Sequence, residues 1–358
     1  LAALIGSGQA QGNQNTIING AMNVAQRGTS STGIGAAAGY FTCDRWKIDS
    51  TTSAGRLTMT QTADGPSGFA NCIKLDCTTA DASIGAEEYG ILAQRLEGQD
   101  LQKFMKGTSD AKSYTVSFYV KGNASATYIL ELIDRDNSRS VSKAFSVTTD
   151  WSRVELTFPA DTTGAFGDDN AASLDLQWWF HSGSTYNSGT LQQTWAGTTA
   201  ANRAVGGDSF FDSTNRTFFI TGVQLEVGEQ ATPFEHRSYG DELARCQRYY
   251  YKVDAALNVD EIIGSGYQSS STQIDLTIPY QVTMRTYPTA LEQTGTATDY
   301  KIQRAQGQTT CSAVPTFGSA NLVAARIRCT VSSGMTSGEG AAFRFGTTDS
   351  YLAWSAEL

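Results

Sequence analysis

Charge is scarce in this chain of 358 residues, and positive charge is scarcest. Charged residues make up 17% of the sequence, and 35 Asp and Glu outnumber 26 Lys and Arg, which gives a net charge of −9. Proteins that bind nucleic acids or anionic membrane surfaces gather Lys and Arg on one face. Because no basic run occurs in the sequence, neither class of partner is expected.

Long apolar runs, histidines and common catalytic motifs are also lacking. No apolar run approaches the roughly 20 residues of a membrane-spanning helix, so membrane insertion is not expected. The two histidines, His181 and His236, cannot supply a metal site that needs three. No G-x-S-x-G, H-E-x-x-H or P-loop motif occurs. Acid pairs such as Asp168 and Asp169 have the residue types of a glycosidase, but loop acids are the simpler interpretation, and no enzyme activity is predicted.

The six cysteines are Cys43, Cys72, Cys77, Cys246, Cys311 and Cys329. An even number allows disulfides. However, Cys72 and Cys77 lie on one strand-like run, where an odd spacing points their side chains to opposite faces. The sequence therefore favours buried free thiols, which suit assembly in a reducing cytosol.

Short apolar runs separated by Gly, Ser, Asn and Asp are abundant. Several alternate with a period of two, which is typical of half-buried strands. The clearest apolar faces are Tyr114, Val116, Phe118 and Val120; Val154, Leu156 and Phe158; and Leu174, Leu176, Trp178 and Phe180. These strands and the glycine-rich turns between them predict an all-β, antiparallel sandwich over residues 16–251. Residues 1–15 are small and polar, and are predicted to be a linker or attachment segment.

A short helix is expected to close this first domain. Ser238 and Asp241 form an S-x-x-D start, and Leu243, Cys246 and Tyr250 follow at helical spacing, which predicts a helix over about 239–251. Residues 96–106 offer a weaker helical pattern. Beyond the first helix, two further alternating runs predict a smaller C-terminal β-sandwich over 252–358. Their apolar faces are Ile274, Leu276 and Ile278, and Val323, Ala325, Ile327, Cys329 and Val331.

Several stretches resemble known proteins. NTIINGAMNVAQRG at 15–28 and FTCDRW at 41–46 look like the opening of a tail-fibre and virion-protein module of tailed bacteriophages. The stretches at 113–122 and 151–160 look like paired strands of carbohydrate-binding jelly rolls. The stretch FFITGVQLEVGEQATPFEHRSYGDELARCQRYYYK at 218–252 is similar to the end of the phage module and is the most specific element.

The resemblance implies a jelly-roll β-sandwich in a virion protein, often a homotrimer. The expected function is a non-enzymatic tail or head fibre, a receptor-binding adhesin that attaches to host surface glycans and is assembled in the host cytoplasm with other virion proteins. One alternative is a capsid decoration or fibre-adaptor protein that binds no glycan, and another is a tail-associated glycan hydrolase. Fold similarity alone does not choose between them.

Aromatic side chains suggest where a glycan would bind, because sugar rings stack on flat aromatic faces while amides and carboxylates orient the hydroxyls. The candidate contacts are Gln177, Trp179 and His181 on the outward face of one strand, Tyr119 on another, and Tyr186 and Trp195 in the long segment 182–209. The alternative is that Trp179 packs beneath that segment or against a neighbouring subunit.

Asp134, Asp136 and Asn137 form a D-x-D-N sequence with oxygen ligands of the kind that Ca²⁺ prefers. The sequence lacks the glycine and the distal glutamate of an EF-hand loop, and a polar turn is the simpler interpretation. No cofactor is expected beyond a structural calcium ion, for which these three residues are the candidates.

Overall fold

The computed structural model describes residues 14–51, 53–255, 259 and 261–358. Strands make up 44% of the structure and helices 8%, so the chain is nearly all β, as predicted. It divides into two compact units. The first unit comprises the described residues up to Glu242 together with Leu358, and the second runs from Leu243 to Glu357. The division falls inside helix α2 (Tyr239–Gln247), ahead of the boundary expected after residue 251. Most of the expected N-terminal linker lies outside the described residues.

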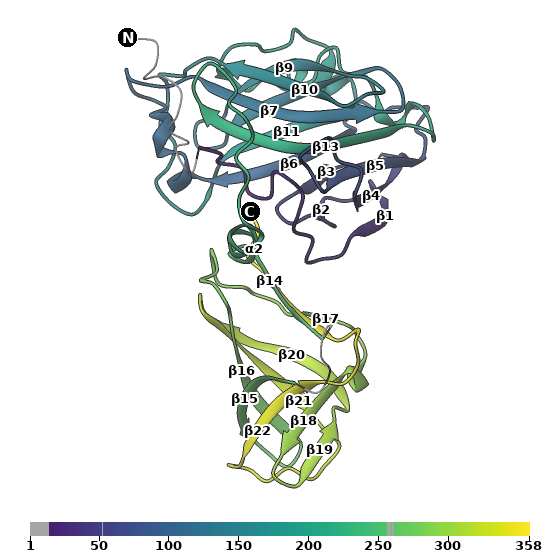
Figure 1. Ribbon diagram of the computed structural model, residues 1–358, viewed down its shortest axis with the longest axis vertical. Helices are drawn as coiled ribbons and strands as arrows, with labels where there is room; N and C mark the ends of the chain where they lie inside the picture. The colour runs from purple at the N-terminus through teal and green to yellow at the C-terminus, as the bar shows by residue number, and fades with distance from the viewer. Residues whose placement is uncertain (1–13, 52, 256–258, 260) are drawn as a thin grey trace. The chain divides into compact units, whose positions relative to one another are not determined.

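Two antiparallel sheets form the first unit (Figure 1). One sheet has the order β1 (Ser30–Ile34), β4 (Arg56–Thr62), β5 (Cys72–Thr79), β13 (Thr217–Val227), β7 (Tyr114–Gly122) and β10 (Ser152–Phe158). The other has the order β12 (Ala196–Gly197), β9 (Arg139–Val147), β8 (Ala126–Asp134), β11 (Ala172–Ser182), β6 (Tyr89–Glu97), β3 (Lys47–Ser50) and β2 (Gly39–Tyr40). This arrangement confirms the predicted antiparallel β-sandwich of jelly-roll type.

The core between these sheets follows the period-two pattern of the sequence. The predicted apolar faces of β7 and β11 lie entirely in one buried cluster, and that of β10 lies in it or packs against it. Within this cluster, the Trp178 ring centroid lies 5.5 Å from that of Trp46 and 5.6 Å from that of Phe118. Because successive side chains of a strand point to opposite faces, this placement turns Asp175, Gln177 and Trp179 outward, away from that core.

The second unit contains two further antiparallel sheets. A three-stranded sheet has the order β14 (Tyr250–Asp254), β23 (Tyr351–Ser355) and β17 (Glu292–Gln293). A seven-stranded sheet has the order β19 (Gly307–Thr310), β18 (Tyr300–Arg304), β22 (Gly340–Phe345), β15 (Ile262–Gln268), β16 (Gln273–Pro279), β21 (Ala324–Thr330) and β20 (Ala313–Ala320). The predicted faces of β16 and β21 are buried in the core of this unit, except that Val323 is 55% exposed because β21 begins after it.

Two helix predictions need correction. Helix α2 is capped by Ser238, whose Oγ accepts a hydrogen bond from Asp241 N, but it ends at Gln247 rather than at residue 251. Tyr250 and Tyr251 instead begin β14, since aromatic residues favour strands and this pair finds β23 as a partner. The helical pattern at 96–106 forms only two 3-10 turns, Gly98–Asp100 and Gln102–Phe104. Gly98, a poor helix former, lies in the first of them.

The cysteines are as predicted: all six are buried and free. The connection after β11 carries helix α1 (Ser184–Asn187), strand β12, and the 3-10 turns η3 (Ala200–Asn202) and η4 (Phe210–Asp212). We call residues 183–209 the covering segment, because part of it lies over the outer face of the seven-stranded sheet of the first unit. None of the described helices has the length and apolarity needed to cross a membrane.

Candidate functional site

A pocket of about 430 Å³ lies on the outer face of the seven-stranded sheet of the first unit. This volume is typical of small-molecule sites. The sheet contributes residues of β3, β6, β8 and β11, and the remaining wall comes from the turn between β8 and β9 and from the covering segment. The lining residues used below are Asp49, Tyr89, Arg95, Asp134, Arg135, Gln177, Trp179, Tyr186 and Arg203.

Three aromatic rings form the apolar part of the pocket. Trp179 is 2% exposed, and its ring centroid lies 5.9 Å from Tyr89 and 5.4 Å from Tyr186. The guanidinium carbon of Arg203 lies 4.6 Å from the Trp179 ring centroid, so this cation covers the indole. Trp179 is therefore the base of the pocket, and the half-buried Tyr89 and Tyr186 are the rings that a ligand can reach.

Besides the contact with Arg203, the indole has a hydrogen bond to the sheet. Trp179 Nε1 donates a hydrogen bond of 2.9 Å to Glu131 Oε2 on the neighbouring strand β8. Arg203 pairs with the same carboxylate at 2.9 Å and also donates to Gln177 Oε1 at 3.0 Å. Burial raises the pKa of Glu131, while Arg203 and the indole act in the opposite direction. The network fixes the outward side chains of β8 and β11 in place before any ligand arrives.

The other charges of the pocket are also paired. Asp175, which is fully buried, lies 3.4 Å from Arg95 and 2.9 Å from Arg135, measured between side-chain N and O atoms. Arg95 also lies 3.4 Å from Asp49. Each pocket arginine thus has a carboxylate partner, and no single sign of charge dominates. Such a surface suits a neutral ligand with many hydroxyl groups better than an anion or a cation.

Only three of the six predicted glycan contacts lie in this pocket: Gln177, Trp179 and Tyr186. Tyr119 lies on β7 in the other sheet, with its ring 5.2 Å from that of Phe69. Trp195 packs against the sandwich core, and its Nε1 donates to the backbone oxygen of Pro159. His181 is buried near Glu88. The structure therefore does not bring Tyr119, Trp195 and His181 to the pocket.

The burial of Trp179 also bears on the two interpretations of this residue. Trp179 packs in a small cluster with Ile91, Ile129 and Ala204, and Leu191 of the covering segment lies against that cluster. These contacts agree with the second interpretation, in which the indole packs beneath the long segment. Its contact with a ligand is limited to the small exposed part of the ring.

The D-x-D-N residues form a closed turn. The Asp134 carboxylate is fully buried and lies 2.5 Å from the ammonium of Lys106, and it also accepts hydrogen bonds from the backbone N and the Nδ2 of Asn137. Asp136 accepts a hydrogen bond from Gly167 N. Lys106 already supplies a positive charge to Asp134, and both aspartates accept hydrogen bonds within the protein.

Sequence reasoning missed Asp49, Tyr89, Arg95, Arg135 and Arg203. Two of them, Tyr89 and Arg95, could have been found from the alternation of side chains on β6. Odd-numbered residues of this strand face outward, opposite the core residue Leu92. For Arg203 no signal exists, because it reaches Trp179 only through the path of the covering segment.

Comparisons with known proteins add the following. No family model matches the chain, and no curated protein matches it. Among solved structures, a family 4 carbohydrate-binding module matches at 10% identity with a TM-score of 0.30, covering 59% of this chain and 98% of its own. A family 61 module, TmCBM61, solved in complex with β-1,4-galactotriose, matches at 10% identity and 0.32, covering 60% and 99%. The enzymatically active domain of bacteriophage CBA120 tailspike protein 4 matches at 10% identity and 0.31, covering 60% of this chain and 22% of its own. Similarity this distant carries no argument about function.

Proposed function

We propose that the first unit binds a neutral glycan in the pocket of the seven-stranded sheet, and that the chain serves as a tail or head fibre adhesin of a bacteriophage. The single observation that supports glycan binding is the combination of two accessible tyrosines with ion-paired polar groups in one pocket of about 430 Å³. Tyr89 and Tyr186 meet at 83° with centroids 5.5 Å apart, so they present two ring faces at an angle. The assignment to a virion rests on the sequence resemblance alone.

Recognition would divide between stacking and hydrogen bonding. The apolar face of a pyranose ring stacks on a tyrosine, while Arg135, whose side chain is 43% exposed, and Gln177 orient hydroxyl groups. Because the arginines keep their carboxylate partners, no buried charge has to be neutralised by the ligand. Binding is then weak at each site, and a trimer would raise the overall affinity by presenting several sites at once.

The proposal is for binding without catalysis. A glycosidase needs a carboxylic acid that is protonated at working pH beside a second carboxylate. The pocket carboxylates Asp49 and Asp134 are instead paired with cations, Asp49 with Arg95 and Asp134 with Lys106, so neither is free to act on a ligand. Incubation with host polysaccharide should therefore release no reducing ends.

A glycan array probed with the purified full chain tests this function. Tyr186→Ala should weaken binding to any hit by about five- to tenfold, the equivalent of one lost stacking contact. Tyr119→Ala is the matched control, since this tyrosine is also half-buried but lies on the other sheet. Equal losses in both variants, or binding that survives Tyr186→Ala unchanged, would reject the pocket as the site.

The virion setting needs its own tests. Mass spectrometry of purified phage particles should detect this chain, and light scattering should show a homotrimer. A chain present on particles that binds no glycan would favour the capsid-decoration or adaptor alternative.

A further inference from the structure

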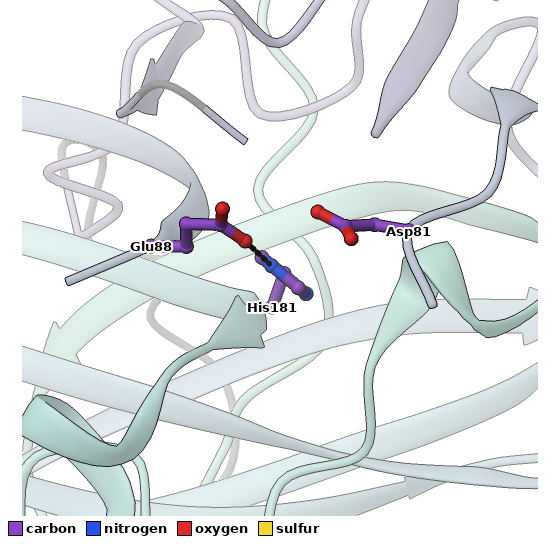
Figure 2. Close-up of side chains that lie close together, drawn as sticks. All are labelled: Asp81, Glu88 and His181. Atoms are coloured by element: carbon purple, nitrogen blue, oxygen red, sulfur yellow. Dashed lines mark ion pairs between the residues drawn. The ribbon is translucent and has the colours of Figure 1, made fainter. Parts of the chain in front are cut away.

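A second cluster of polar side chains lies at one end of the sandwich, outside the pocket. Asp81 follows β5 of the six-stranded sheet, Glu88 directly precedes β6 of the seven-stranded sheet, and His181 is the penultimate residue of β11. Figure 2 shows the two carboxylates approaching the imidazole from different sides. One potential ligand atom from each residue lies within 4.8 Å of the other two, so the cluster joins both sheets at one point.

Two buried polar atoms of this cluster, one of His181 and one of Glu88, lack hydrogen-bond partners. His181 Nε2 lies 3.6 Å from Glu88 Oε2, too far for a hydrogen bond, and neither atom has any other hydrogen-bond partner. The His181 side chain is fully buried. A buried nitrogen or oxygen left without a hydrogen bond destabilises the folded state, so such atoms need an explanation.

The rest of the cluster is held firmly in place. His181 Nδ1 is hydrogen-bonded to Ser209 Oγ at 2.8 Å, which fixes the ring and leaves Nε2 directed at the carboxylates. Asp81 accepts hydrogen bonds from Ser53 Oγ and from the backbone N of Ala54 and Ser83. Partners of this kind, which orient a ligand through its other atoms, are typical of metal sites.

Charge gives the strongest argument. Among the described residues, no Lys or Arg pairs with Asp81 or Glu88, whereas the buried carboxylates of Asp134, Glu131 and Asp175 each have one. Two carboxylates therefore lie beside one imidazole nitrogen without a cationic partner, and a divalent cation would compensate their charge.

We propose that Asp81, Glu88 and His181 bind a divalent first-row transition-metal ion such as Zn²⁺ or Mn²⁺. One imidazole nitrogen with two carboxylate oxygens suits these ions, whereas Ca²⁺ prefers oxygen ligands only. Bonds of about 2.1 Å allow two ligands of one ion to lie up to about 4.2 Å apart, so a small contraction of the cluster completes the site. Water fills the remaining positions.

The ion would stabilise this end of the sandwich. It would link the loop after β5 to both β6 and β11, and so join the two sheets. The first residue of the covering segment is attached to this cluster, since Gly183 N donates a hydrogen bond of 2.7 Å to the backbone oxygen of Glu88. The site is independent of the glycan pocket, and failure of either proposal leaves the other standing.

The test uses the full chain, stripped with EDTA and dialysed against Zn²⁺, Mn²⁺, Co²⁺ or Ca²⁺ in turn. One Zn²⁺ or Mn²⁺ per chain should bind and raise the melting temperature. His181→Gln should weaken binding by about tenfold or more. His236→Gln is the matched control, because this second histidine packs against Phe69 and Phe234 and is not part of the cluster, and it should bind like the wild type.

A second pair of variants and a direct measurement guard against misfolding of the histidine variant. Glu88→Gln should lose binding, whereas Glu87→Gln, at the exposed neighbouring position, should not. X-ray absorption of the zinc-loaded wild type should show one imidazole in the ligand shell. The proposal is overturned if Ca²⁺ alone binds, if no ion binds at one per chain, if His181→Gln folds and binds as tightly as the wild type, or if the absorption spectrum shows no imidazole.

Discussion

Replacement of Lys106 by methionine should be among the most damaging single changes to the first unit. The Lys106 ammonium is fully buried and lies 2.5 Å from Asp134 and 3.1 Å from Asp161. It also donates to the backbone oxygens of Thr163 and Gly164 at 2.8 and 2.7 Å. Methionine keeps most of the side-chain volume, so the change removes the charge and the hydrogen bonds with little loss of packing.

The expected loss of stability depends on which partners Asp134 and Asp161 retain in the variant. Asp161 retains two hydrogen bonds from Arg139, at 2.8 and 3.0 Å, whereas Asp134 is left with the hydrogen bonds from Asn137 and no cation. Removing one partner of a buried ion pair costs about 3–5 kcal/mol because the other charge stays buried. We therefore expect Lys106→Met to lower the free energy of unfolding by about 3–5 kcal/mol, mainly through Asp134.

A second substitution separates charge from packing. Asp134→Asn in the Lys106→Met background removes the stranded charge while leaving an oxygen for Asn137, and it should recover about 2 kcal/mol or more of the loss. Lys121→Met is the control, since that lysine pairs with Asp64, which is 52% exposed, and such a pair contributes at most about 1 kcal/mol.

Urea unfolding of the full chain, followed by tryptophan fluorescence, measures these differences. A Lys106→Met variant within about 1 kcal/mol of the wild type would refute the reasoning. So would a double variant no more stable than the single one, because the cost would then not come from the charge left on Asp134.

Three further predictions concern other parts of the chain. Hydrogen bonds from Arg328 and Arg326 lower the pKa of Asp275, so the second unit should lose stability as the pH falls below about 4. In Asp275→Asn, the melting temperature of the second unit should depend less on pH in this acid range. The same pH dependence as in the wild type would contradict this role of Asp275. Burial raises the pKa of Cys72 to about 12, so at pH 8 the thiols should react with Ellman's reagent only as the protein unfolds; reaction at the rate of a free thiol would contradict their burial. A Cβ atom at Gly20 would lie 2.2 Å from Val223 O, so Gly20→Ala should cost about 1–3 kcal/mol, measured as a lower urea midpoint that an unperturbed variant would not show.

The sequence was most informative where one face of a strand is buried along its whole length. On β7, Tyr114, Val116, Phe118 and Val120 are all fully buried, because each points into the same core. Alternation encodes this geometry directly, since a shift by one residue would expose the entire set. The end of helix α2 was harder, because helical spacing continues to Tyr250 and only pairing with β23 decides in favour of a strand.

The candidate pocket could be predicted only in part, for a physical reason. Alternation correctly turned Gln177 and Trp179 away from the core, but it does not say what lies over the outer face of a sheet. In this chain the covering segment lies there, and Arg203 and Ala204 bury the indole from above. Tyr119 has the same outward parity, and only the sheet order places it on the opposite side of the sandwich.

His181 shows the same limit in a form that has consequences for function. Parity assigned it to the outward face of β11 beside Trp179, and that placement suggested a sugar contact. At the strand end, however, loops close over it: Asp81 and Glu88 both come from the connection between β5 and β6, and Ser209 comes from the end of the covering segment. The covering segment therefore contributes to two distinct sites, since it supplies Tyr186 and Arg203 to the pocket and Ser209 to the His181 cluster. A change that loosens this segment should affect both sites, whereas substitutions within either site should affect that site alone.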